Sequence, residues 1–105
     1  MTARDWNDME HHYTLIGQTP VEEPDFLLWA AWYEQADRIV AQDQIGDVLV
    51  STVFLGRDHN FFGDGPPLLF ETTVFEGPED GACWRRSTWL EAEVQHARAL
   101  AKVNE

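Results

Sequence analysis

The chain has 105 residues and a mass of 12.1 kDa, which fits one small domain, residues 1–105, and excludes a multidomain enzyme. Five Trp, six Phe and two Tyr supply large side chains for a modest core. The charge is unusual, because 19 Asp and Glu against seven Arg and Lys leave a formal net charge of −12. Such a surface repels nucleic acid and anionic membranes, and it attracts basic proteins or cations.

The single cysteine, Cys83, excludes an internal disulfide framework and a cysteine-based zinc cluster, and it fits a reducing compartment. The first residues lack the apolar run of a secretory signal. The longest apolar stretch, residues 26–33, is too short to cross a bilayer. We therefore expect a cytoplasmic protein without a membrane segment and without direct nucleic-acid contacts.

The first part of the chain predicts a short strand and one helix. Residues 1–12 are polar and are expected to fray or to form a short helix. Residues 13–17 predict a strand, and residues 18–24 predict a loop because two prolines bracket it. Residues 25–42 have the period of an amphipathic helix. Asp25 caps its start, and its apolar side chains fall within about 140° of arc, namely Leu28, Trp29, Trp32, Tyr33, Ala36, Ile39 and Val40.

After Gly46 the apolar period changes to two, which predicts strands. Residues 48–55 are apolar on both faces, as in a central strand that is covered on two sides or lies at an interface. Residues 68–76 predict a second strand, because they are rich in β-branched and aromatic side chains. Residues 77–81 predict a turn, and residues 82–86 predict a third strand.

The last helix begins at a capping box, Thr88-x-x-Glu91, and is predicted to run to about Val103. Its expected apolar stripe consists of Trp89, Leu90, Val94, Ala97, Leu100 and Ala101. The element order is thus β-α-β-β-β-α with short connections. It predicts an α+β fold, in which a small antiparallel sheet of three to four strands has two helices packed on one face.

The connection at residues 56–67 is longer than the two to five residues of an ordinary hairpin turn. The functional interpretation is a binding loop held by two strands, with candidate residues Asp58, His59, Asn60, Phe61, Phe62 and Asp64. The structural interpretation is a folded-back turn. Here Asp58 and Asn60 bond the local backbone, and Phe61 or Phe62 covers the sheet edge.

No nucleophile elbow, phosphate loop or metal-ligand spacing stands out, so we predict no catalytic residue, no metal and no cofactor. One alternative is a module that binds a small molecule or metal ion, or a small hydrolase with His59 as base. It would use Asp58, His59, Asn60, Asp64 and Glu71. Cys83 has two interpretations, a small core residue or a thiol whose pKa Arg85 and Arg86 lower.

The carboxylates occur in small groups rather than in a disordered tail, and one group is Glu76, Glu79 and Asp80 at the predicted turn. Carboxylates at phosphate-like intervals on a folded scaffold can occupy the nucleic-acid groove of a basic protein. The alternative is an ordinary solvated surface. We include these three residues among the candidate binding residues.

Residues 50–77, VSTVFLGRDHNFFGDGPPLLFETTVFEG, and residues 87–96, STWLEAEVQH, resemble a family of small proteins encoded by bacteriophages and prophages. The shared motif is STVFLG-x-DHN…GPPLLFET, and the resemblance covers somewhat more than a third of the chain. It implies a mobile-element gene expressed in a bacterial cytoplasm. It transfers no activity and no catalytic residue.

Charge, size and this resemblance lead to one main hypothesis. The protein is not an enzyme, and it binds and inhibits a basic, nucleic-acid-handling host protein, for example as an anti-CRISPR-like DNA mimic. A third hypothesis is a homo-oligomeric structural protein, because the two-sided apolar strand 48–55 would allow a homodimer.

Overall fold

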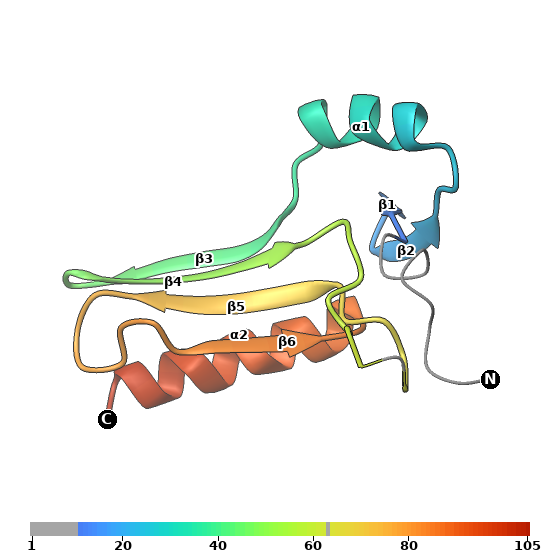
Figure 1. The fold of residues 1–105 in the computed structure, drawn as a ribbon. Coiled ribbons are helices and arrows are strands. Elements are labelled where there is room, and N and C mark those ends of the chain that lie inside the picture. Colours follow the sequence, from blue (N-terminus) through green and yellow to red (C-terminus); the bar gives the residue numbers. More distant parts are fainter. Residues whose placement is uncertain (1–10, 63) are drawn as a thin grey trace.

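The computed structural model describes residues 11–62 and 64–105 and has an α+β fold (Figure 1). The hairpin of β1 (Tyr13–Ile16) and β2 (Thr19–Glu22) leads into α1 (Phe26–Gln35). The strands β3 (Ile39–Ile45), β4 (Val48–Phe54), β5 (Phe70–Phe75) and β6 (Cys83–Arg86) follow, and α2 (Trp89–Val103) comes last. The α+β class and the antiparallel sheet are confirmed. The expectation for residues 1–12 lies, except for His11 and His12, outside the described residues.

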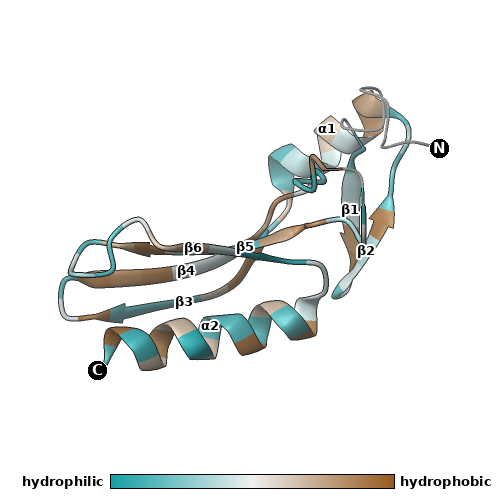
Figure 2. Cartoon of the chain, turned by 60° about the horizontal axis from the view of Figure 1, so that its bottom comes forward, coloured by the Kyte–Doolittle hydropathy of each residue, from teal (hydrophilic) through white to brown (hydrophobic). Residues whose placement is uncertain are grey.

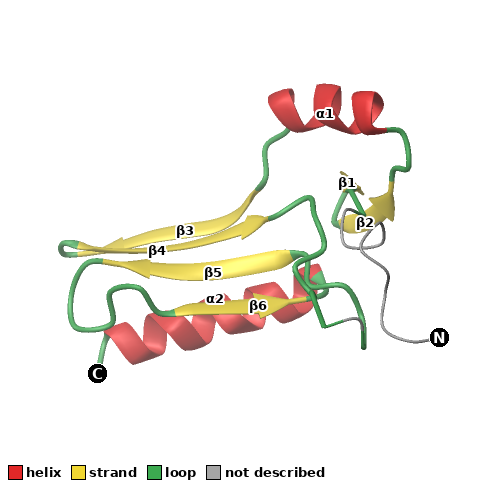
Figure 3. Cartoon of the chain, viewed as in Figure 1, coloured by secondary structure: helices red, strands yellow, loops and turns green. Residues whose placement is uncertain are grey.

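The main sheet has the strand order β3-β4-β5-β6, and each neighbouring pair is antiparallel. The sheet is a meander in which β4 and β5 are central, as expected for the strand predicted at residues 48–55. The helix α2 runs along one face of this sheet and contacts all four strands (Figure 3). No helix among the described elements covers the opposite face, so only one of the two faces has a helical layer.

The core lies between the sheet and α2 and follows the two-residue period of the strands. Val50, Phe54, Phe70 and Val74 alternate along β4 and β5 and are at most 1% exposed. They pack in two clusters, one with Ala92 and the other with Ala99 of α2. The small alanines let the helix approach the sheet closely, so the large aromatic volume comes from the strands.

The helix predicted for residues 25–42 is shorter than expected, and this part of the prediction was wrong. Asp25 caps α1 as predicted, through its Oδ1 and the N–H groups of Leu27 and Leu28. The helix ends at Gln35, and residues 39–45 form β3. Two long-range interactions explain the ending, because Ile39 pairs with Val53 and the Arg38 side chain donates to the carbonyl of Phe54. Strand pairing with a distant segment thus overrides the local helical period.

The loop predicted for residues 18–24 is also wrong over part of its length, because residues 19–22 form β2. Pro20 pairs with Leu15 in a two-stranded sheet, where both strands are edges. A proline is tolerated on an edge strand, since its missing N–H group can face away from the ladder. Pro20 therefore lies in an edge strand, whereas Pro24 lies in the short connection between β2 and α1.

The expectation of two helices on one sheet face is corrected as well. Only α2 lies on the sheet, whereas α1 contacts β1 and stands beyond the end of the sheet (Figure 1). Trp29 is buried there, and its indole N–H donates to the carbonyl of Tyr13. The exposed side chains of α1 include Phe26, Leu27 and Leu28.

Most of the apolar stripe predicted for α2 does not face the sheet, and only Trp89 and Leu100 of it pack against the core. The capping box and the end at Val103 are confirmed, and Figure 2 shows apolar and polar residues alternating along the helix. The fully buried positions are Ala92, Gln95, His96 and Ala99, whereas Trp89 and Leu100 are only half-buried. The other four residues of the predicted stripe are exposed, namely Leu90, Val94, Ala97 and Ala101. The sheet centre selects this orientation, because its buried hydroxyl groups need polar partners.

Within residues 11–62 and 64–105, neither helix has the length and apolar character needed to traverse a lipid bilayer.

Candidate functional site

The connection between β4 and β5 is the candidate site, and its frame consists of two buried polar side chains. Asp58 is 2% exposed, and its Oδ1 accepts from the N–H groups of Asn60 and Leu68. Asn60 is also buried, and its amide donates to the carbonyls of Asp64 and Pro66. These bonds join the two ends of the loop. This part of the structural interpretation is therefore correct, because Asp58 and Asn60 hold the backbone.

The base of the loop is also fixed to its neighbours by backbone hydrogen bonds. His59 N–H donates to the carbonyl of Leu68, and Leu55 N–H donates to that of Leu69. The residues that follow β4 contact the start of β1. His12 and Arg57 form an antiparallel β-bridge, and Tyr13 N–H donates to the carbonyl of Gly56. The loop is thus held on two sides although it is long.

The tip of the loop presents aromatic side chains to solvent. Phe61 is 52% exposed and Phe62 is 86% exposed, so neither covers the sheet edge. That part of the structural interpretation was wrong. The His59 ring lies beside Phe61, with 5.5 Å between the ring centroids, and its Nδ1 is 2.9 Å from the carbonyl oxygen of Arg57. Asp64 is exposed on the same tip. The loop therefore combines a fixed base with an exposed aromatic tip.

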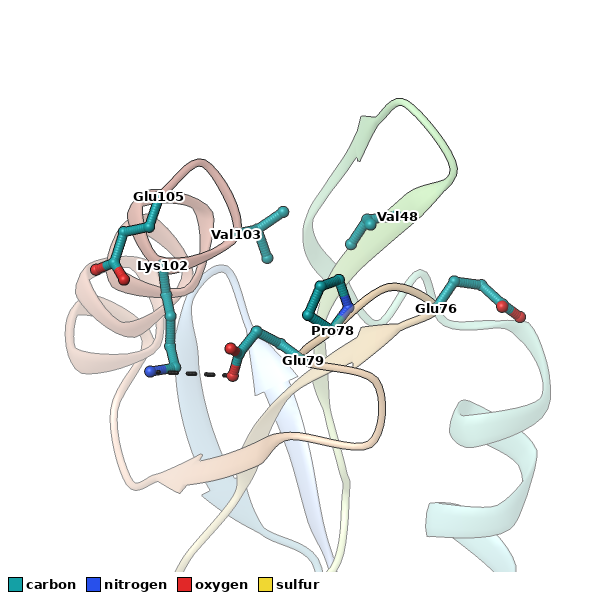
Figure 4. A pocket seen from close by; sticks show the side chains of 7 residues that line it. All are labelled: Val48, Glu76, Pro78, Glu79, Lys102, Val103 and Glu105. Carbon is teal, nitrogen blue, oxygen red and sulfur yellow. Dashed lines mark ion pairs between the residues drawn. The ribbon is translucent and has the colours of Figure 1, made fainter.

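The second group of candidate residues lies at the turn between β5 and β6. The carboxylate of Asp80 accepts the N–H of Glu76, which has a positive φ of 73°. Glu79 lies 3.9 Å from the ammonium of Lys102 (Figure 4). Asp80 thus stabilises the turn, and Glu79 has a cation of its own chain nearby, so the three carboxylates are not equally available to a partner.

A pocket of about 250 Å³ opens at this turn (Figure 4). Its lining consists of Val48, Glu76, Pro78, Glu79, Lys102, Val103 and Glu105. The volume is below the roughly 300–1,000 Å³ of typical ligand sites, and the carboxylates make it polar. The pocket is therefore smaller than a typical ligand site, and four of its seven lining residues are charged.

Glu71 is separate from the loop, because it lies on the uncovered face of the sheet. Its Oε2 is 2.9 Å from Arg85 Nε, and its Oε1 accepts from Thr73. Within the described segments, no hydrogen bond joins His59 to a carboxylate, and no group of three His, Cys, Asp or Glu side chains could hold a metal ion. Of the five residues of the hydrolase or metal alternative, the structure keeps Asp58, His59, Asn60 and Asp64 in one loop and places Glu71 apart from them.

Cys83 lies on the same uncovered face and is exposed rather than part of the core. Desolvation raises the pKa of its thiol above the ordinary value. A hydrogen bond to Glu71 and the charge of that carboxylate also raise the pKa, and together with desolvation they outweigh the lowering by a hydrogen bond to Thr73 and by the charge of Arg85. The interpretation of Cys83 as a thiol with a lowered pKa was wrong, because desolvation and the acidic neighbour together outweigh the arginine.

A buried row of hydrogen-bonded polar side chains connects the sheet with α2, and no local sequence pattern indicates it. His96 Nε2 is 2.7 Å from Asp43 Oδ2, and His96 Nδ1 is 2.7 Å from Thr52 Oγ1. Thr52 Oγ1 in turn lies 2.6 Å from Thr72 Oγ1. Such an order of carboxylate, imidazole and hydroxyl resembles a catalytic triad. Thr52 is 0% exposed, however, so no substrate reaches its hydroxyl group. The hydrogen bonds among these four side chains are therefore structural.

The sequence matches no family model, and comparison with curated proteins and with solved structures finds no match.

Proposed function

We propose that this protein acts by binding another protein and is not an enzyme. The proposed partner is a basic, nucleic-acid-handling host protein that is inhibited by the binding, as in an anti-CRISPR-like or DNA-mimic mechanism. The proposed setting is a bacterial host cytoplasm, in line with the resemblance to phage and prophage proteins. The observation that carries the proposal is the loop after β4, where Phe61 and Phe62 are exposed above a buried polar frame.

Exposed aromatic side chains on a fixed frame are suited to anchor a protein interface. Aromatic residues are enriched among the residues that contribute most to binding, because they bury large areas at a small entropic cost. The bonds of Asp58 and Asn60 hold the loop before binding, so less conformational freedom is lost when a partner docks. This supports the loop as the centre of the contact.

The charge supports a basic partner. The chain carries 19 acidic against seven basic side chains, and some of the basic ones have partners within the chain. Arg85 pairs with Glu71, Lys102 lies near Glu79, and Arg86 donates to Gln95. The net field around the protein is negative, so a basic protein is attracted over a distance and associates faster.

The experiment is affinity capture of the tagged full chain from a bacterial host lysate at low and at high salt. We expect recovery of a basic nucleic-acid-binding protein that is released at high salt, because screening weakens the attraction. The affinity for the purified partner is then measured at two ionic strengths. An affinity that stays unchanged when ionic strength doubles would contradict the mimic mechanism.

Two variants test the loop. Phe62→Ser removes the exposed aromatic ring, and Leu27→Ser is the matched control, because Leu27 is 77% exposed on α1 and far from the loop in the chain. We expect the Phe62 variant to lose at least about tenfold in affinity, as for a central aromatic anchor, and the Leu27 variant to bind normally. Equal binding by both variants would place the contact elsewhere.

A further inference from the structure

The outer face of α2 is apolar although it points away from the sheet. Leu90 is 70% exposed and Val94 is 44% exposed, and both alanines of the same face, Ala97 and Ala101, are exposed. At 100° per residue these four side chains fall within about 60° of arc. They lie opposite the buried face of Ala92, Gln95, His96 and Ala99, so α2 has an apolar face that the sheet does not cover.

The spacing along this outer face is that of a coiled-coil seam. The four residues follow one another at intervals of four, three and four, which is the pattern of alternating d and a positions. We call Leu90, Val94, Ala97 and Ala101 the outer seam. A helix with such a seam packs against a second helix at a small crossing angle. Figure 2 shows no described element on the side of α2 that points away from the sheet, and the four side chains of the outer seam are exposed.

We propose that the outer seam binds a second copy of this chain in an antiparallel helix pair. The sizes of the side chains favour this occupant. An antiparallel pair places Leu90 opposite Ala101 of the second copy and Val94 opposite Ala97, so each layer combines one large and one small residue. A parallel pair would place alanine on alanine in two layers and leave them underpacked.

The charges beside the outer seam are complementary in the same arrangement. Glu91 and Arg98 both occupy positions next to the d residues, and these positions face each other in an antiparallel pair. Glu91 and Arg98 of the second copy are then about 3 Å apart along the helix axis. Glu91 accepts both the N–H and the hydroxyl of Thr88 with Oε1, so Oε2 can accept from the guanidinium without breaking the cap. Two such ion pairs form by symmetry.

The association should be weak, because α2 has 15 residues and offers four layers. A helix pair of this length buries a surface area at the low end of the range for specific protein interfaces. We therefore expect a dissociation constant in the micromolar range. Each copy also carries a net charge of −12, so the two copies repel each other through their overall fields. Salt screens this repulsion, and we expect the dimer to become stronger as salt rises. Binding of a basic partner has the opposite salt dependence.

The first test is sedimentation equilibrium of the full chain up to a concentration of about 1 mM. The expected result is a shift from 12.1 kDa towards twice that mass. Val94→Glu should raise the dissociation constant on the order of a hundredfold, because it buries two like charges in the seam. Leu27→Glu is the matched control on α1 and should leave the dimer unchanged. A wild type that stays monomeric, or an equal loss in both variants, would overturn the proposal.

Cross-linking tests the antiparallel arrangement. The background carries Cys83→Ser, because the native thiol is exposed. A mixture of Val94→Cys and Ala97→Cys should form disulfide-linked dimers between the two variants on mild oxidation, whereas each variant alone should cross-link several-fold less. Cross-linking of Val94→Cys with itself alone would indicate a parallel pair and would overturn the proposed arrangement. Circular dichroism of each variant serves as the check that its helical content, and hence its fold, is retained.

Discussion

The most consequential residues of this fold are buried polar ones that connect distant segments. Thr52 and Thr72 lie at the centre of the sheet, and their hydroxyl groups are within hydrogen-bond distance of each other. His96 reaches Thr52 from α2 and Asp43 from β3. An unpaired hydroxyl here would carry its full desolvation cost, so His96 has to face the sheet. These contacts fix the rotation of α2 about its axis.

Thr52→Val removes the hydroxyl but keeps the shape of the side chain. We expect a loss of about 1–3 kcal/mol of unfolding free energy, because Thr72 and His96 each lose a buried partner. Thr73→Val on the uncovered sheet face is the control, since this residue is only half-buried and its hydroxyl bond to Glu71 is 3.3 Å long. Urea unfolding of both variants measures the difference. Equal unfolding free energies of the two variants would show that the buried hydrogen bonds of Thr52 add no more stability than the half-buried one of Thr73.

The thiol of Cys83 should react slowly, because its raised pKa leaves little thiolate at neutral pH. Glu71→Gln removes the charge that helps to raise this pKa, so the pKa should fall and alkylation should become a few-fold faster at the same pH. Alkylation rates over a pH series give the pKa directly. A slower reaction of the Gln variant would contradict the assigned role of Glu71.

The sign of the effect on stability follows from the same pKa. A thiol with a raised pKa in the folded chain stays protonated after the unfolded thiol has begun to ionise. Its contribution to stability is present below the ordinary thiol pKa and is lost as the pH rises through and above it. The Gln variant should lose less stability over this alkaline range than the wild type.

At the scale of the elements, the position of α1 depends on its contact with Gly56, two residues after the end of β4. Trp29 and Tyr33 stack, with 4.7 Å between their ring centroids, and both lie against Gly56. Gly56 has a φ of +78°, and a Cβ atom there would be only 2.9 Å from a ring carbon of Tyr33. The glycine thus allows both the turn and the close approach of the helix.

Gly56→Ala should destabilise the protein by more than the cost of its backbone conformation. Gly81→Ala is a matched control, because Gly81 also has a positive φ, +88°, but no atom within 4 Å of the added Cβ. Both variants carry about 1–2 kcal/mol of backbone strain, and only the first also collides with α1. Thermal unfolding should therefore show a larger loss for Gly56→Ala. Similar losses would mean that α1 moves aside at no cost.

The capping box of α2 is a second feature at this scale. Thr88 Oγ1 accepts the N–H of Glu91, and Glu91 Oε1 accepts the N–H of Thr88. Thr88→Ala should cost about 1 kcal/mol of unfolding free energy. Ser87→Ala, one residue before the cap, is the control and should change stability less in the same urea experiment.

At the scale of the whole molecule, the proposed interactions use different surfaces and different forces. The loop with Phe61 and Phe62 is proposed for a basic partner, and the outer seam of α2 for a second copy. Because the protein carries −12 charges, salt should weaken the first association and strengthen the second. Measuring both at two salt concentrations separates them, since either proposal can fail while the other holds.

Much of the fold could be predicted from local sequence signals. The capping box at Thr88, the cap at Asp25, the strand at residues 48–54 and the turn at residues 77–81 all lie where the sequence places them. In the candidate site, the long loop and the backbone bonds of Asp58 and Asn60 were predictable too. These features depend on residues near each other in the chain, whose preferences act without the rest of the fold.

Tertiary structure decided the rest, because the interactions involved join segments far apart in the chain. The end of α1 depends on β4, through Arg38 and Phe54. The buried face of α2 depends on the bond between His96 and Thr52, which are 44 residues apart. Hydrophobic periodicity alone places Leu90 and Val94 in the core, but the need to pair buried hydroxyl groups outweighs it. The sequence by itself thus determined the class and most elements, whereas packing determined which apolar surface remains exposed.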